Sequence, residues 1–144
     1  MKKILYSLLL FASAILFAQT STNVQFAVYN DALGTVEMFD AYKKEVISKV
    51  FYKGEKVPSH LKKFSNLTEK GLTEFKLRKE FGMPDIVSLY ALNEQNSVAT
   101  STPINIEGYI FKQTNINIYS EMIKKIEVRE DSGKKYLFIL TNNN

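Results

Sequence analysis

Histidine and cysteine, the residues most used for nucleophilic catalysis and metal binding, are scarce in this chain. His60 is the single histidine and there is no cysteine, so a cysteine–histidine dyad and the common zinc sites lack their ligands. His60 follows Pro58 near a lysine pair, a setting typical of a surface turn. No serine lies in a nucleophile-elbow sequence, and Ser132-Gly133 lacks the preceding glycine of a phosphate-binding loop. We therefore predict no catalytic residue, cofactor or metal site.

Acidic residues near the C-terminus are the remaining candidates for catalysis. Glu121, Glu127, Glu130 and Asp131 are close in the sequence, and two carboxylates held a few ångströms apart can hydrolyse a glycosidic bond. On a strand, however, Glu127 and Asp131 fall on the same side and are expected to face water. A small carboxylate-dependent hydrolase is therefore the least favoured of three functional hypotheses.

Aromatic residues offer a second kind of chemistry, namely binding. The chain has eight tyrosines and ten phenylalanines but no tryptophan. Most tyrosines are expected to be half-buried sheet residues, although tyrosine also gives amphipathic contact area at a binding face. Our candidate binding residues are Tyr109 and Tyr119, together with Glu107 and Asn115 from the same third of the chain.

Several strands and short helices are expected to position these residues. Alternation and β-branched content predict strands over residues 24–29, 72–77, 104–111, 124–130 and 134–140. Short helical turns are expected over 58–64 and 120–123, and a helix over 86–95 with Asp85 as its N-cap. The turn sequence at 130–133 predicts a C-terminal β-hairpin. Within residues 30–70, the segment 32–50 fits helical spacing and 46–52 fits a strand, so this layout stays open.

The pattern of elements favours an α+β fold. We predict one small domain over residues 19–144, with a mostly antiparallel sheet of five or six strands and two or three short helices. Removing residues 1–18 from the 144-residue chain leaves 126 residues, enough for one core without disulfides.

The N-terminus has the three parts of a secretory signal peptide. A basic Met1-Lys2-Lys3 precedes an apolar run over residues 4–17, and Ala18 supplies a small residue for cleavage. We therefore expect cleavage near Ala18 and an exported protein, either periplasmic or secreted. No later apolar run approaches the length that spans a bilayer.

The charge of the mature chain does not indicate nucleic-acid binding. Without residues 1–18 the chain has 17 basic and 15 acidic residues, and only Arg78 and Arg129 are arginines. Bidentate phosphate recognition relies on arginine, and the lysine pairs are interleaved with glutamate as on a solvated surface. Asn66-Leu67-Thr68 matches a glycosylation sequon, which matters only in a pathway that uses it.

Three strand-like segments near the C-terminus carry a family resemblance. Residues 103–108 read Pro-Ile-Asn-Ile-Glu-Gly, residues 120–128 read Ser-Glu-Met-Ile-Lys-Lys-Ile-Glu-Val, and residues 134–141 read Lys-Lys-Tyr-Leu-Phe-Ile-Leu-Thr. The segment 103–141 resembles the plug domain of TonB-dependent outer-membrane transporters, especially the glycan-importing branch. The matching positions are Ile104, Ile106, Glu107, Gly108, Ile123, Ile126, Glu127, Val128, Leu137, Ile139 and Thr141.

The chain also departs from that family. Glu107 stands where the family usually has aspartate, and the turn at Asp131-Ser132-Gly133 replaces a short helix that ends in Tyr-Gly. Nothing is left to build a barrel, so the transporter's gating function does not carry over. What the resemblance implies is an envelope module that binds or docks a protein or a glycan. The alternatives are a secreted structural or adhesion protein with polar Asn/Gln-rich contact loops, and the hydrolase above.

Overall fold

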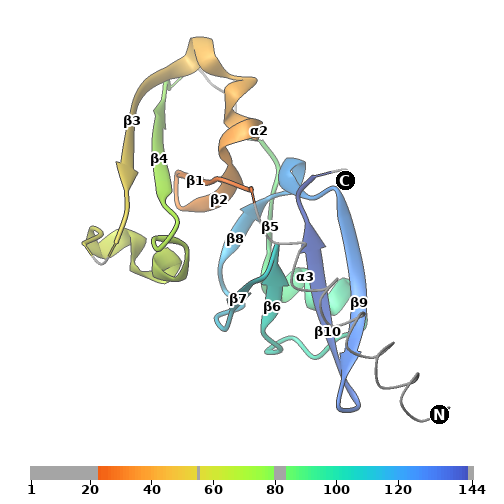
Figure 1. Cartoon of the computed structure of the whole chain (residues 1–144). Helices are drawn as coiled ribbons and strands as arrows, with labels where there is room; N and C mark the ends of the chain where they lie inside the picture. Colours follow the sequence, from red (N-terminus) through yellow and green to blue (C-terminus); the bar gives the residue numbers. More distant parts are fainter. Residues whose placement is uncertain (1–22, 55, 80–83, 143–144) are drawn as a thin grey trace, which may run out of the picture.

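Figure 1 shows a computed structural model of the chain, which describes residues 23–54, 56–79 and 84–142. These residues form an α+β fold with ten strands in two sheets and five short helical segments. The fold class predicted from the sequence is confirmed. The predicted signal peptide, residues 1–18, lies outside the described residues. Within the described ranges, no helix has the length and apolar content needed to cross a membrane.

The larger sheet has six strands in the order β3-β4-β1-β2-β8-β5. Their bounds are β1 Phe26–Tyr29, β2 Ala32–Thr35, β3 Val46–Tyr52, β4 Leu72–Leu77, β5 Ile86–Ser88 and β8 Asn117–Tyr119. β1 pairs antiparallel with β2 and parallel with β4, and β2 pairs parallel with β8. β3 and β5 form the two edges of this sheet.

The smaller sheet has four strands in the order β7-β6-β10-β9. Their bounds are β6 Ile104–Ile106, β7 Tyr109–Phe111, β9 Lys125–Asp131 and β10 Lys134–Leu140. β9 and β10 pair antiparallel along their whole length, which confirms the predicted C-terminal hairpin. The strands expected from the sequence are divided between the two sheets: those predicted over residues 24–29 and 72–77 lie in the larger sheet, and those over 104–111, 124–130 and 134–140 lie in the smaller one. Across both sheets, five of the eight strand pairings are antiparallel.

Short helical segments connect or cover the strands. Two are α-helices, α2 over Val36–Asp40 and α3 over Leu89–Gln95. Three are 3₁₀ helices, η1 over Lys43–Glu45, η2 over Ser59–Leu67 and η3 over Ser120–Met122. The helical turns predicted near residues 58–64 and 120–123 are thus present, and η2 extends further than predicted.

Three tight turns join antiparallel strands through two residues that both have positive φ. They are Asn30-Asp31 (48° and 67°), Glu107-Gly108 (52° and 95°) and Ser132-Gly133 (52° and 80°). Positive φ at both positions defines the type I′ turn, whose twist matches that of an antiparallel hairpin. The prediction of one strand over residues 104–111 is therefore wrong, because the chain reverses at Glu107-Gly108 into two three-residue strands.

The segment over residues 86–95 also differs from its prediction. Ile86–Ser88 pairs antiparallel with β8 as strand β5, so the helix begins only at Leu89. The N-cap is Ser88 rather than the predicted Asp85, and its Oγ accepts a hydrogen bond from the Ala91 N–H at 3.0 Å. Strand pairing across the sheet has overridden the local helical pattern at residues 86–88.

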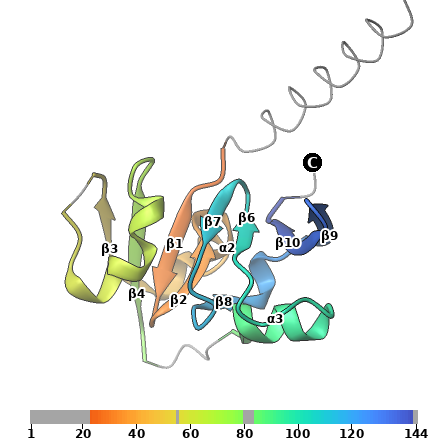
Figure 2. The same cartoon turned by 90° about the horizontal axis from the view of Figure 1, so that it is seen from below.

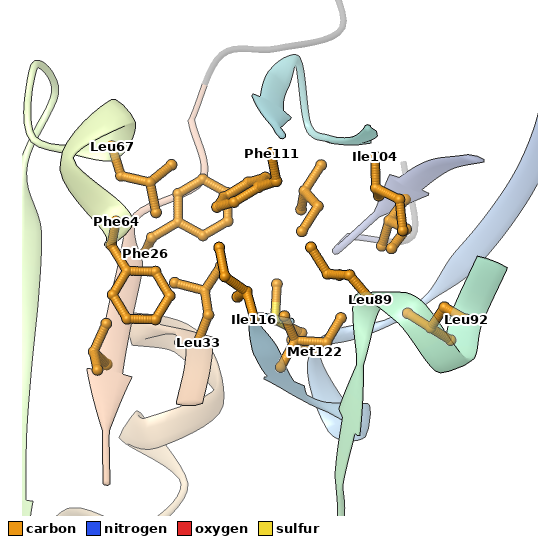
Figure 3. Packing of buried hydrophobic residues seen from close by; sticks show 14 of the residues in the cluster. Phe26, Leu33, Phe64, Leu67, Leu89, Leu92, Ile104, Phe111, Ile116 and Met122 are labelled. Carbon is orange, nitrogen blue, oxygen red and sulfur yellow. The ribbon is translucent and has the colours of Figure 1, made fainter. Parts of the chain in front are cut away.

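The main hydrophobic core lies between the two sheets. Figure 3 shows it as a continuous cluster of side chains from both sheets, η2 and α3; the labelled residues are Phe26, Leu33, Phe64, Leu67, Leu89, Leu92, Ile104, Phe111, Ile116 and Met122. In η2, Leu61, Phe64 and Leu67 are each at most 1% exposed. Their spacing of three places them on one face of a 3₁₀ helix, so this segment closes one side of the core.

Helix α2 covers the opposite face of the larger sheet. Its N-cap Thr35 accepts a hydrogen bond from the Met38 N–H through Oγ1 at 3.1 Å. The helix thereby presents Phe39, which is fully buried, to the sheet. The Phe39 ring lies 5.0 Å from that of Phe75 and 5.6 Å from that of Tyr119. The central strands of this sheet are therefore buried on both faces.

Candidate functional site

Tyr119, one of the four candidate binding residues, lies in the interior. Its side chain is fully buried at the end of β8, and its hydroxyl donates a hydrogen bond to the Tyr29 carbonyl at 2.6 Å. Burial raises the pKa of the Tyr119 phenol far above its ordinary value, so the group stays a protonated donor at physiological pH. Tyr119 thus ties β8 to the β1–β2 hairpin.

Glu107 also has its carboxylate in the interior, with 1% of the residue exposed. Its Oε1 accepts hydrogen bonds from the Thr141 N–H at 2.6 Å and from the Thr141 hydroxyl at 3.0 Å. Its own N–H donates to the Ile139 carbonyl at 3.0 Å. A buried carboxylate needs such donors to offset its desolvation, and here they tie the β6–β7 turn to the end of β10.

Tyr109 and Asn115 lie closer to solvent. Tyr109 is half-buried on β7, with its ring edge-on to Phe26 at 5.5 Å and the Lys70 Nζ 6.0 Å from its centroid. Asn115 is exposed in the turn that precedes β8. The four candidates therefore occupy different environments, two in the interior, one at the rim of the core and one at the surface.

The residues considered for acid–base catalysis are engaged in other contacts. The His60 Nε2 lies 2.6 Å from the Glu74 Oε2, which links η2 to β4. The Tyr42 hydroxyl donates to both oxygens of Glu121 at 2.9 Å, and this hydrogen bond raises the Tyr42 pKa. Hydrogen bonding to Arg129 lowers the pKa of Glu127, whereas a general acid requires a raised one. In the described part of the chain, no three His, Asp or Glu residues are grouped as metal ligands.

Two open grooves lie where the two sheets meet. Their volumes are about 550 and 510 Å³, and they share Thr35, Glu37, Lys124 and Thr141 in their walls. The Thr35 hydroxyl caps α2 and the Thr141 hydroxyl donates to Glu107, so both hydroxyls have hydrogen-bond partners within the fold. The charged residues that the two grooves share, Glu37 and Lys124, are of opposite sign.

The exposed apolar surface is concentrated instead on strand β3. Ile47, Val50 and Phe51 are 58%, 47% and 62% exposed, and β3 is an edge strand whose described neighbour is β4 alone. Figure 2 shows β3 at the outer margin of the molecule, beyond β4. We call these three side chains the β3 patch. Sequence reasoning noted the strand character of residues 46–52 but not their exposure, since exposure depends on what packs against them.

Gly71 holds the largest member of the β3 patch in place. It has a φ of +114°, and a Cβ built there would lie 2.3 Å from the Phe51 ring. The ring therefore rests directly on the backbone of Gly71, the residue that precedes β4. The Phe51 side chain is exposed, and its contact with Gly71 fixes its position. An anchor residue in an interface has both properties.

A groove of about 400 Å³ adjoins the β3 patch. Its lining residues come from β3, β4 and the end of β1: Tyr29, Asn30, Ser48, Val50, Glu74, Phe75 and Lys76. Val50 belongs to both the patch and the groove, so apolar and polar contacts adjoin along one strand. The groove therefore lies on the Val50 face of β3 and adds polar contacts beside that residue.

The sequence shows little similarity to known proteins. No protein-family model matches the sequence, and no solved structure matches it. Among curated proteins, the chain is similar to the B component of the aspartyl/glutamyl-tRNA(Asn/Gln) amidotransferase of Borrelia recurrentis, with 28% identity over 112 residues. The aligned part is 78% of this chain but 20% of that protein, so the chain spans about a fifth of its relative's length.

Proposed function

We propose that this chain is an exported docking module of the bacterial cell envelope that binds another protein through strand β3. The single observation that carries the proposal is the β3 patch, in which Ile47, Val50 and Phe51 are each about half exposed or more on one edge strand. Exposed apolar side chains grouped along one edge strand of an otherwise well-packed domain indicate an interaction surface. A protein partner suits this apolar strand better than a glycan.

The N-terminal sequence supports export. The basic head, the apolar run over residues 4–17 and Ala18 follow the pattern of a cleaved signal peptide. The absence of cysteine means that the domain needs no disulfide after export, because packing between two sheets supplies its stability.

The plug-like segment supports an envelope setting. β6, β9 and β10, which carry the resemblance to TonB-dependent plug domains, lie together in one sheet. Docking is the part of the family's behaviour that we extend to this chain. The amidotransferase activity named for the Borrelia protein is that of a molecule of which this chain covers 20%, and we do not extend it to this chain.

Site-specific photo-crosslinking in intact cells tests the proposal. A photoreactive phenylalanine analogue replaces Ile47 in one strain and Val128, 50% exposed on β9, in the matched control. We expect discrete protein adducts from position 47, few from position 128, and a mature chain in the envelope or medium that lacks residues 1–18. Equal adducts from both positions, adducts from neither, or a cytosolic chain that retains Met1 would overturn the proposal. Adducts with polar-loop positions such as Asn115 instead would favour the adhesion alternative.

A further inference from the structure

The free side of β3 has the geometry that accepts another strand. β3 pairs antiparallel with β4 on one side, with a bulge between Val46 and Ser48, and on the other side it ends the sheet as the structure describes it. In an antiparallel strand, alternate residues direct their N–H and C=O groups to opposite sides. Every second residue of β3 therefore directs its backbone groups outward, and an extended segment can bind such an edge by hydrogen bonding to the main chain.

The side chains of β3 provide apolar contacts on both faces of such a segment. Val50 lies opposite Glu74 and Phe51 lies opposite Thr73, and neighbouring residues of a strand point to opposite faces. A segment added alongside β3 would therefore meet Val50 on one face and Phe51 on the other. Ile47, which lies within the bulge, adds exposed apolar surface near the start of the strand.

The charge around β3 is positive. Lys49 stands at the centre of the strand and is exposed. The described residues of the segments 43–56 and 72–80 include eight lysines or arginines and two glutamates, Glu45 and Glu74. In the described part of these segments, Glu74 is engaged with His60 at 2.6 Å. Opposite charges on adjacent strands stabilise the pairing and like charges weaken it, so the edge favours an acidic segment.

The same charge argues against a second copy of this chain as the occupant. Two β3 strands side by side would bring two lysine-rich segments together, centred on Lys49. The other described edges are less suitable for strand addition. β5 and β7 have three residues each, and β9 carries five charged side chains in seven positions.

We infer that β3 binds its partner by strand addition, and that the partner contributes an extended acidic segment with apolar residues at alternate positions. This inference rests on the proposed docking function and specifies the class of partner. It requires about seven residues of partner strand, the length of β3, with carboxylates placed near Lys49.

Peptide binding to the purified chain tests the inference. The probe is a fluorescent peptide, Glu-Val-Glu-Phe-Glu-Val-Glu, and its match has lysine at every glutamate position. We expect the acidic peptide to bind more tightly, and Lys49→Glu to weaken its binding about fivefold while it strengthens binding of the basic peptide. Lys134→Glu, at an exposed position of the other sheet, is the matched control and should leave both affinities unchanged.

A third peptide separates strand addition from side-chain contact alone. The acidic peptide with N-methyl groups at alternate residues keeps its side chains but loses the main-chain donors along one side. Its binding should fall at least tenfold if backbone pairing holds the complex. Equal binding of methylated and unmethylated peptides, equal binding of acidic and basic peptides, or a dimer of the free chain in light scattering that Lys49→Glu disrupts would each overturn the inference.

The two proposals fail in different ways. Peptide affinity is measured on purified protein and does not depend on export. Specific adducts from position 47 in cells, combined with no binding of the acidic peptide, would leave the docking function in place and exclude this class of partner. Peptide binding without adducts in cells would show that β3 can accept an acidic strand and would exclude the proposed docking function in the envelope.

Discussion

Strands β3 and β9 are both seven residues long and both form the edge of a sheet, yet they present opposite surfaces. Figures 1 and 2 place them at opposite ends of the molecule. β9 carries five charged side chains in its seven positions, whereas β3 carries one, Lys49. Charged side chains on an edge strand prevent unwanted pairing with other chains. β9 is therefore charged along most of its length, whereas β3 combines one lysine and a bulge with three exposed apolar side chains.

The charges of β9 are organised into contacts across its outward face. Glu127 lies 3.2 Å from the Lys125 Nζ and 2.7 Å from an Arg129 nitrogen. The Arg129 guanidinium lies 3.7 Å from the centroid of the Phe138 ring on β10. This cation–π contact covers an aromatic ring on the outer face of the sheet. On β3 the corresponding aromatic, Phe51, rests on Gly71 and is open to solvent. This contrast between the two long edges supports the proposed interface on β3.

The largest expected effect contrasts the glycines beside the two edges. A Cβ at Gly71 would lie 2.3 Å from the Phe51 ring at a φ of +114°, whereas a Cβ at Gly133 has no atom within 4 Å at a φ of +80°. We expect Gly71→Ala to lower the free energy of unfolding by about 2–3 kcal/mol and Gly133→Ala by about 1 kcal/mol. Urea unfolding followed by circular dichroism measures both, and equal losses would show that Phe51 is not fixed on Gly71.

The next effect concerns the core between the two edges. Tyr119→Phe removes the hydrogen bond that the buried Tyr119 hydroxyl donates to the Tyr29 carbonyl, so we expect a loss of about 1–2 kcal/mol in the free energy of unfolding. Tyr90→Phe is the matched control, because Tyr90 is 48% exposed and should tolerate the change. Adducts from position 47 should survive Tyr119→Phe at temperatures where the variant is folded. Their selective loss would mean that Tyr119 contributes to binding after all.

Removing the Arg129 side chain should expose the apolar surface that it covers beside β9, so that this edge is exposed like that of β3. Arg129→Ala loses the hydrogen bonds to Glu127 and the contact with Phe138, at a cost of about 1 kcal/mol in the free energy of unfolding. Lys134→Ala, exposed on the neighbouring strand, controls for the loss of one positive charge. We also expect Arg129→Ala to self-associate more than the control in light scattering. A monomeric variant of unchanged stability would show that these contacts do not protect the edge.

The ion pairs of β9 should make a small, pH-dependent contribution. Hydrogen bonding to Arg129 holds the pKa of Glu127 below its ordinary value of 4.5. Because the folded pKa is the lower one, the stabilisation is present above pH 4.5 and is lost as the pH falls through the folded value. The stability difference between the native chain and Glu127→Gln should be under about 1 kcal/mol at neutral pH and shrink as the pH falls below 4.5. A difference that grows on acidification would contradict this assignment.

The smallest effect on stability is expected from adding a charge to β3. Ile47 lies in the bulge and is 58% exposed, so Ile47→Lys should change the free energy of unfolding by less than about 0.5 kcal/mol. The matched change on β9, Val128→Lys, should be similarly mild. Only the β3 variant should lose affinity for the partner, and equal loss from both variants would remove the distinction between the edges.

Local signals predict those elements whose neighbours are also close in sequence. The hairpin of β9 and β10 follows from apolar strands on either side of Ser132-Gly133, and β4 has its predicted bounds over residues 72–77. The failures arise where a tertiary contact competes with a local pattern. Ile86–Ser88 has a helical pattern but pairs with β8. Residues 104–111 alternate like one strand, but the chain reverses in a tight turn at Glu107, whose φ is positive and whose carboxylate accepts hydrogen bonds from Thr141.

The candidate site was harder to predict from the sequence than the fold. Tyr119 and Glu107 have residue types suited to binding, but the fold uses both to join distant strands. The β3 patch escapes sequence reasoning because its residues have the composition of a buried strand. Whether Val50 and Phe51 are covered depends on whether another strand lies beyond β3, and no local pattern encodes that.

The sequence by itself determined the α+β class, the C-terminal hairpin and a thiol-free core, because alternation, turn residues and composition act over a few neighbouring positions. Only the tertiary structure decided how ten strands divide between two sheets and which strands form the edges. Parallel pairs such as β1 with β4 and β6 with β10 join segments more than 25 residues apart. Their pairing is decided by burial summed over the whole core, and so is the exposure of β3.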